Sequence, residues 1–211
     1  MGIILLDIGN VLVNVDFMPF CRAVSREGEP GAAAIMERYC QGELKDRHDT
    51  GRTGPLEYLA MIAADPLTLD LPLDRLRLAW QDIFAPTPGS AEAVEALRQR
   101  HRHRLWIMSD TDPLHFAFLI DRFPVLRNMD RYFLSYEHGW LKRSPEAFRH
   151  VLDSSGLDAS EFLLIDDREV NTRTCAVAGV QSILFRSWKE TLASSLLAAF
   201  SQHSVHEEAS L

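Results

Sequence analysis

The stretch IILLDIGNVLVNVD, residues 3–16, places a single carboxylate, Asp7, directly after four consecutive aliphatic residues. A short run that is apolar at every position is typical of a strand buried on both faces of a parallel sheet. Gly9 and Asn10 follow at once, and these residue types favour a turn. Because burying a carboxylate is unfavourable unless it is paired or used, we expect Asp7 to have a chemical role where this strand ends.

Four similar runs occur much later in the chain, separated by stretches with helical patterning. They are RLWIMS (104–109), RYFLS (131–135), FLLIDD (162–167) and QSILF (181–185). Capping residues and prolines delimit the helices expected between them, at 91–101, 145–156 and 169–179. This alternation predicts βαβ units, and therefore an α/β protein with a Rossmann-like, three-layer core around a parallel sheet.

The segment between the first two predicted strands has helical patterning and no convincing strand. We therefore predict a core domain of residues 1–16 and 86–211, interrupted by a small helical domain of residues 17–85. The aromatic side chains of this insertion are spaced as in a helical core, although they could also contact a ligand; they are Phe17, Phe20, Trp80 and Phe84. The loop HDTGRTG (48–54) is equally compatible with a plain connector and with one wall of a binding site.

The composition limits the possible functions of the protein. The chain has 211 residues, a formal net charge of −8 and three cysteines without a CxxC motif. The negative charge argues against a nucleic-acid surface, and the cysteine pattern argues against a disulfide framework or a zinc cluster. No apolar run approaches the roughly 18 residues that a membrane span needs. We expect a cytoplasmic protein that acts on a small polar ligand, with no nucleic-acid or membrane partner and with no indication of its oligomeric state.

Polar residues follow several of the predicted strands. Asp7, Ser109 and the pair Asp166 and Asp167 end three of them, and Lys142 comes shortly after another. Ligands of open parallel sheets bind at the carboxyl ends of the strands, so we expect these side chains to meet. Three adjacent carboxylates would repel one another unless a cation lay among them, and Mg²⁺ prefers oxygen ligands. A phosphate held there by Ser109 and Lys142 would leave Asp7 poised to attack phosphorus.

In order and spacing, these motifs resemble those of the haloacid dehalogenase-like superfamily of phosphotransferases, over about residues 1–190. The motifs that carry the resemblance are LLDIGNVL (5–12), WIMSDT (106–111), GWLKRSPEAF (139–148), and LLIDDREVN (163–171) followed by AVAGV (176–180). The helical insertion is similar to the small cap that closes over the substrate in this family. More narrowly, three of the motifs resemble a bacterial branch that includes an alpha-glucose-1-phosphate phosphatase.

The resemblance implies roles for ten residues of these motifs. The catalytic residues would be Asp7, Ser109 and Lys142. The phosphate would be bound by Ser109, Asp110, Thr111 and Lys142. The metal would be held by Asp7, the Gly9 carbonyl, Asp166 and Asp167, with support from Asn10 and Asn171. The implied cofactor is Mg²⁺. The implied activity is hydrolysis of a small phosphorylated metabolite, such as a sugar 1-phosphate, through an aspartyl-phosphate intermediate.

The chain departs from the family pattern at Gly9, where the family usually has an aspartate that serves as general acid and base. Asp110 stands where asparagine is common, and Arg143 replaces the usual proline. His115, expected in a loop or on a helix surface, or Asp16 could take over the missing acid and base role. Three alternatives stay open: a haloacid dehalogenase, which uses the same nucleophile on carbon without a metal; a phosphate-binding protein that has lost turnover; and a sugar phosphomutase, which also depends on an acid and base.

Overall fold

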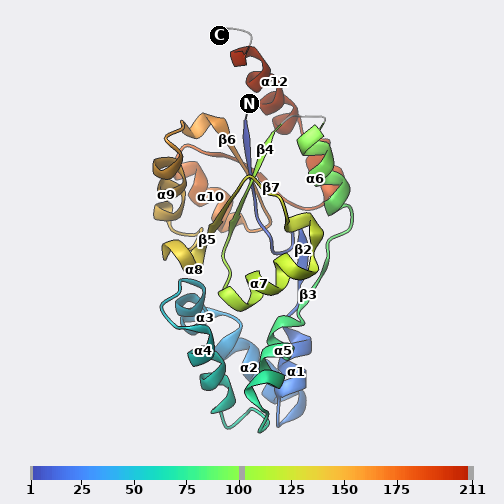
Figure 1. The fold of residues 1–211 in the computed structure, drawn as a ribbon, viewed down its shortest axis with the longest axis vertical. Coiled ribbons are helices and arrows are strands. Elements are labelled where there is room, and N and C mark those ends of the chain that lie inside the picture. Colours follow the sequence, from blue (N-terminus) through green and yellow to red (C-terminus); the bar gives the residue numbers. More distant parts are fainter. Residues whose placement is uncertain (1, 100–102, 209–211) are drawn as a thin grey trace.

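The computed structural model describes residues 2–99 and 103–208 and contains a central parallel sheet (Figure 1). The strand order is β5-β4-β1-β6-β7, with β1 in the middle. The five strands are β1 (Ile3–Leu6), β4 (Arg104–Ser109), β5 (Arg131–Leu134), β6 (Phe162–Asp166) and β7 (Gln181–Leu184). The five predicted strands are therefore confirmed, with ends that differ by at most one residue.

Helices cover both faces of this sheet. Ile4 and Leu6 of β1 pack in one hydrophobic cluster, and Ile3 and Leu5 pack in another, as alternation along a strand requires. The first face is covered by α6 (Ser90–Gln99), α7 (Pro113–Arg122), α11 (Trp188–Leu192) and α12 (Ser195–Glu208), and the second by α9 (Pro145–Ser155) and α10 (Glu169–Val177). Short helices η1 (Pro124–Leu126), α8 (Ser135–His138) and η2 (Ala159–Glu161) complete the connections. The predicted three-layer α/β core is confirmed.

Five helices of the insertion gather beyond the carboxyl ends of the strands (Figure 1). They are α1 (Met18–Val24), α2 (Gly28–Tyr39), α3 (Gly42–Asp49), α4 (Pro55–Ala63) and α5 (Leu73–Gln81). Their buried side chains form a hydrophobic cluster of their own, centred on Phe20, Tyr58 and Trp80. This cluster agrees with a separate helical domain, although its predicted boundaries at 17 and 85 stay a prediction. No helix in the described ranges is both long and apolar enough to cross a membrane.

A second, two-stranded sheet joins the insertion to the core. Strand β2 (Val13–Val15) pairs antiparallel with β3 (Phe84–Pro86), and the Asp16 N–H donates to the Ile83 carbonyl at 2.9 Å. The expectation of no strand between 17 and 85 is wrong at Phe84 and Ala85, because a strand of three residues is too short to show a periodic pattern. The pairing places the point where the chain leaves the core beside the point where it returns.

Candidate active site

Asp7 follows β1 directly and is buried, as its sequence position predicts. Its Oδ1 accepts a hydrogen bond from the Ile8 N–H at 2.7 Å and lies 2.7 Å from Lys142 Nζ. The pKa of Asp7 is raised to about 8: burial is the largest cause, Lys142 opposes it, and the nearby carboxylates of Asp166 and Asp167 add to it. The structure thus holds this carboxyl where an added positive charge would favour its ionised form.

Lys142 lies between two carboxylates that come from neighbouring strands. Its Nζ is 2.6 Å from Asp166 Oδ2, and its side chain is 2% exposed. Asp166 ends β6 and also accepts hydrogen bonds from the Arg168 N–H at 2.9 Å and from the Asn171 amide at 3.0 and 3.1 Å. Burial raises the pKa of Asp166, but Lys142 and these donors lower it more, so the carboxyl is ionised. Burial lowers the pKa of Lys142, but Asp166 and Asp7 raise it above its ordinary value.

Three carboxylates meet beside this lysine. Asp7, Asp166 and Asp167 each offer an oxygen, and these atoms lie within 4.8 Å of one another. Burial raises the pKa of Asp167, although the Asn10 side-chain amide, which donates to it at 3.2 Å, lowers it. Asn10 has a positive φ of 54° and also accepts from the Val15 N–H at 3.1 Å, so it ties Asp167 to β2. An all-oxygen cluster of this kind suits Mg²⁺.

A pocket of about 350 Å³ opens next to this cluster, at the ends of β1 and β4. Four of the predicted site residues line it: Gly9, Ser109, Asp110 and Thr111. Asp110 accepts a hydrogen bond from the Lys142 N–H at 2.9 Å, and burial raises the pKa of its carboxyl. The Thr111 N–H donates to Ser135 Oγ at 2.9 Å. The structure therefore brings all the predicted site residues to one edge of the sheet, while their individual roles stay predictions.

The opposite wall of the pocket comes from the insertion. Phe17, Gln41, Lys45 and Asp49 line it, together with Phe84 of β3. Phe17 and Phe84 thus contact the pocket, as the sequence allowed, whereas Phe20 and Trp80 are buried in the helical core. The predicted loop 48–54 begins in α3, and its Asp49 belongs to the pocket wall. The helix α3 itself was not predicted.

Sequence reasoning also missed a buried polar cluster around Asp112, which caps α7. Its Oδ1 accepts from the N–H groups of Leu114 and His115 at 2.9 and 3.0 Å. Its Oδ2 lies 2.6 Å from His115 Nδ1, 3.6 Å from His48 Nε2 and 3.9 Å from Lys45 Nζ. Burial raises the pKa of Asp112, but these neighbours, His115 first, lower it well below its ordinary value. The Asp-Pro pair at 112–113 signals a helix start, but the partners from α3 are distant in sequence.

His115 is buried, which corrects the expectation of a loop or helix-surface residue. Its Nε2 lies 2.8 Å from the Trp80 carbonyl, and its ring stacks on that indole with centroids 4.8 Å apart. Both ring nitrogens therefore face acceptors, because Nδ1 is already against Asp112. Asp16, the other replacement considered for the missing acid and base, is exposed and accepts from the Met18 N–H at 2.9 Å. His115 lines the pocket described above and Asp16 does not, and the acid and base role considered for them stays a prediction.

Comparison with known proteins gives the class of the chain. A sequence model of the haloacid dehalogenase-like hydrolases matches residues 1–179. The protein therefore belongs to this family of hydrolases, and the predicted family and enzyme class are confirmed. A curated relative from Bacteroides thetaiotaomicron, a D-ribitol-5-phosphate phosphatase, is 24% identical over 174 residues, which cover 80% of this chain and 84% of the relative. The narrower resemblance to a glucose-1-phosphate phosphatase branch stays a prediction.

Solved structures share the fold. One is an enzyme of this family from Bacteroides thetaiotaomicron in complex with magnesium and inorganic phosphate, with a TM-score of 0.71, 21% identity, and coverage of 89% of this chain and 95% of that one. Another is L-2-haloacid dehalogenase from Xanthobacter autotrophicus with covalently bound chloropropionic acid. Its TM-score is 0.60 and its identity 15%, and the match covers 86% of this chain and 76% of the dehalogenase. Because both a phosphate complex and a dehalogenase have this fold, the fold alone does not choose between those reactions.

Proposed function

We propose that the protein is a Mg²⁺-dependent phosphatase that hydrolyses a small phosphorylated metabolite, a sugar phosphate such as a sugar 1-phosphate. The observation that carries this proposal is the convergence of Asp7, Asp166 and Asp167 at one edge of the sheet. A haloacid dehalogenase needs no metal, so this cluster would be an unexplained repulsion in one. The phosphatase relative and the neighbour with bound magnesium and phosphate support the same choice.

Asp7 is the proposed nucleophile. The Ile8 N–H and Lys142 both contact its Oδ1, which leaves Oδ2 to attack phosphorus. A bond forms between Oδ2 and phosphorus, the bond from phosphorus to the leaving oxygen breaks, and that oxygen takes up a proton from water. Water then attacks the phospho-Asp7, releases inorganic phosphate and restores the carboxylate. Lys142 and Ser109 would hold the phosphoryl oxygens throughout.

Asp7, Asp166 and Asp167 would hold the Mg²⁺, together with the Gly9 carbonyl. The bound cation would offset the burial that raises the pKa of Asp7 and would neutralise charge on the phosphate. Asn10 and Asn171 orient two of these carboxylates through the hydrogen bonds described above.

The test is a screen of phosphorylated metabolites and an aryl phosphate, with and without Mg²⁺, using the wild type and Asp7→Asn. We expect phosphate release that needs both Mg²⁺ and Asp7. Phosphate release that persists in excess chelator would overturn the Mg²⁺ dependence, and release of halide from a 2-haloacid would replace the proposal with the dehalogenase alternative. Tight binding of phosphate esters without any turnover would favour the non-catalytic alternative, which Gly9 keeps open.

A further inference from the structure

Lys45 and Asp49 form a buried ion pair on the pocket-facing side of α3. They are four residues apart, so both project from one face of the helix, and their side chains are 10% and 12% exposed. A buried lysine is rare unless it is paired, because burial removes the hydration of its ammonium group. Both side chains line the pocket, on the wall opposite Ser109. The pair therefore faces the space that a leaving group would occupy.

The pair has hydrogen-bonding capacity left for a ligand. Among the residues that the structure describes, Asp49 alone accepts a hydrogen bond from the Lys45 ammonium, because Asp112 Oδ2 is 3.9 Å away. An ammonium has three N–H donors and a carboxylate has about four acceptor positions. One hydroxyl of a ligand could accept from Lys45 while its neighbour donates to Asp49. Adjacent hydroxyl groups match this arrangement.

The charge of the pocket is balanced. Three basic side chains (Lys45, Arg143 and Arg168) and three acidic ones (Asp46, Asp49 and Asp110) line it. Lys45 is paired with Asp49, and Arg143 with Asp46. A leaving group with its own carboxylate or second phosphate would thus meet two cations that are already paired, Lys45 and Arg143, and it would lie near further carboxylates; the third cation, Arg168, is exposed to solvent. This arrangement favours an uncharged leaving group.

Apolar surface completes the pocket. Phe17 and Phe84 line it, and the Lys45 ammonium is 5.8 Å from the centroid of the Phe17 ring. Small-molecule pockets commonly combine apolar walls with a few polar groups that fix orientation. The C–H surface of a sugar or polyol can pack on these rings while its hydroxyls reach the ion pair.

We infer that Lys45 and Asp49 select the leaving group, and that the substrate is the monophosphate of an uncharged, polyhydroxylated compound with vicinal hydroxyls. The inference rests on the proposed phosphatase function and adds to it the two residues that would recognise the hydroxyl groups of the substrate. The two side chains act on substrate binding and not on the attack at phosphorus, so their loss should raise KM more than it lowers kcat.

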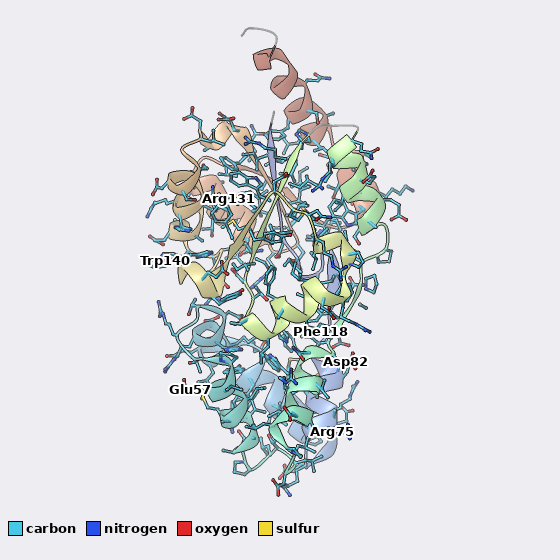
Figure 2. All side chains as sticks on the ribbon, in the orientation of Figure 1. Glu57, Arg75, Asp82, Phe118, Arg131 and Trp140 are labelled. Atoms are coloured by element: carbon cyan, nitrogen blue, oxygen red, sulfur yellow. The ribbon has the colours of Figure 1, made fainter. Side chains whose placement is uncertain are left out.

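The experiment compares four proteins: the wild type, Lys45→Met, Asp49→Asn and the control Arg75→Met. Arg75 is an exposed cation of α5 in the same insertion (labelled in Figure 2), and it does not line the pocket. The substrates are glucose 1-phosphate and a pentitol phosphate, which have vicinal hydroxyls; propyl phosphate and 4-nitrophenyl phosphate, which have none; and phosphoglycolate, whose leaving group is anionic.

For the two hydroxylated substrates, we expect Lys45→Met and Asp49→Asn to raise KM about 10- to 100-fold, the range for losing a hydrogen bond to a charged group. KM for 4-nitrophenyl phosphate should change less than about threefold, and Arg75→Met should change neither. The wild type should prefer both hydroxylated substrates to propyl phosphate and phosphoglycolate. Equal losses on all substrates, or a wild type that prefers phosphoglycolate, would overturn the inference.

The design separates this inference from the proposed function. If the wild type hydrolyses 4-nitrophenyl phosphate but Lys45 and Asp49 do not affect discrimination, only the inference fails. If the wild type hydrolyses no phosphate ester, the proposed function fails. Calorimetric titration with glucose 1-phosphate and the pentitol phosphate then decides the binding role, because binding that is equal in the wild type, Lys45→Met and Asp49→Asn overturns it.

Discussion

Gly9 lies two residues after the proposed nucleophile, in the turn between β1 and β2. Its backbone is outside the left-handed region, and a Cβ added there would lie 3.4 Å from Val15 Cγ2, an ordinary contact. The backbone at this position therefore accepts a residue with a Cβ. Members of the family usually place their general acid and base here. Gly9 therefore removes a chemical group at a position where the backbone does not require glycine.

Without that acid, the protein should depend on substrates whose leaving groups need little protonation. General acid catalysis is typically worth about 10² to 10⁴ in rate. Aryl phosphates and sugar 1-phosphates release more acidic hydroxyls than alkyl phosphates, so we expect glucose 1-phosphate to be hydrolysed faster than glucose 6-phosphate. Gly9→Asp should reduce this preference. Rates for both sugars, measured with both proteins, check the prediction.

Breakdown of the phospho-Asp7 intermediate should also be slow, because its attacking water lacks the usual base. A burst of aryl product should therefore precede the steady state in wild-type protein and disappear in Gly9→Asp. Rapid-mixing kinetics with 4-nitrophenyl phosphate measure it. Equal turnover of the two sugar phosphates together with a burst-free time course would show that another group supplies the acid and base.

Asp112 should contribute strongly to stability. Asp112→Asn keeps a good capping residue on α7 but removes the charge that faces His115, His48 and Lys45. Loss of one partner from a buried ionic cluster typically costs about 3–5 kcal/mol, and we expect that decrease in the free energy of unfolding. Chemical denaturation measures it. Asp16→Asn, at an exposed carboxyl, is the control and should change stability by less than about 0.5 kcal/mol.

The effect of Asp112 should depend on pH. Its pKa in the folded protein lies below the ordinary value of 3.8, so its ionised form stabilises the fold above about pH 4. That contribution is lost as the pH falls from there towards the folded-state pKa. The stability difference between wild type and Asp112→Asn should therefore shrink as the pH falls below about 4. A difference that grows on acidification would contradict the assignment.

The helix α3 is held against the core by a close backbone contact. Gly51, just after α3, has a φ of +71°, and a Cβ there would lie 2.5 Å from the carbonyl oxygen of Tyr136 in α8. Gly51→Ala should push α3 away from the core, displace Lys45 and Asp49, and raise KM for hydroxylated substrates. Gly42→Ala is a matched control. Gly42 has a φ of +74°, but a Cβ added there would have no atom outside the neighbouring residues of the chain within 4 Å.

Both glycine substitutions should lower stability by the strain of a positive φ, on the order of 1 kcal/mol. The clash with Tyr136 is specific to Gly51→Ala, so only that variant should lose substrate affinity beyond its stability loss. Similar KM values for the two variants would mean that this contact does not position α3.

Different elements were predictable to different degrees. The five core strands are runs of aliphatic residues, so their burial is visible in the sequence. Helix α3 (GELKDRHD) has almost no apolar residues, because the side it presents to the pocket is polar, and so hydrophobic periodicity could not identify it. The strand-end residues Asp7, Ser109 and Asp166 were predictable from topology. The grouping of Asp112 with His48 was not, because only tertiary packing brings them together.

At the scale of the whole molecule, the proposed metal site exists only when the sheet is assembled. Asp7 follows β1, whereas Asp166 and Asp167 come from the end of β6, so the unfolded chain has no preformed site. Mg²⁺ should therefore raise the melting temperature by linkage, corresponding to about 2.7 kcal/mol at a concentration 100 times its Kd. Thermal denaturation with increasing Mg²⁺ measures the rise. Asp167→Asn should abolish it, and an unchanged rise in that variant would refute the assignment of Asp167.

The central position of β1 also has a consequence during synthesis. Ile3 pairs with Arg104 on one side and with Phe162 on the other, so β1 is synthesised well before both of its partner strands. Its four aliphatic residues remain without a sheet while the whole insertion is translated. Contacts between such distant segments form slowly, and exposed apolar strands aggregate. The nascent chain should therefore depend on chaperones, and its yield should rise when translation is slowed or the temperature is lowered.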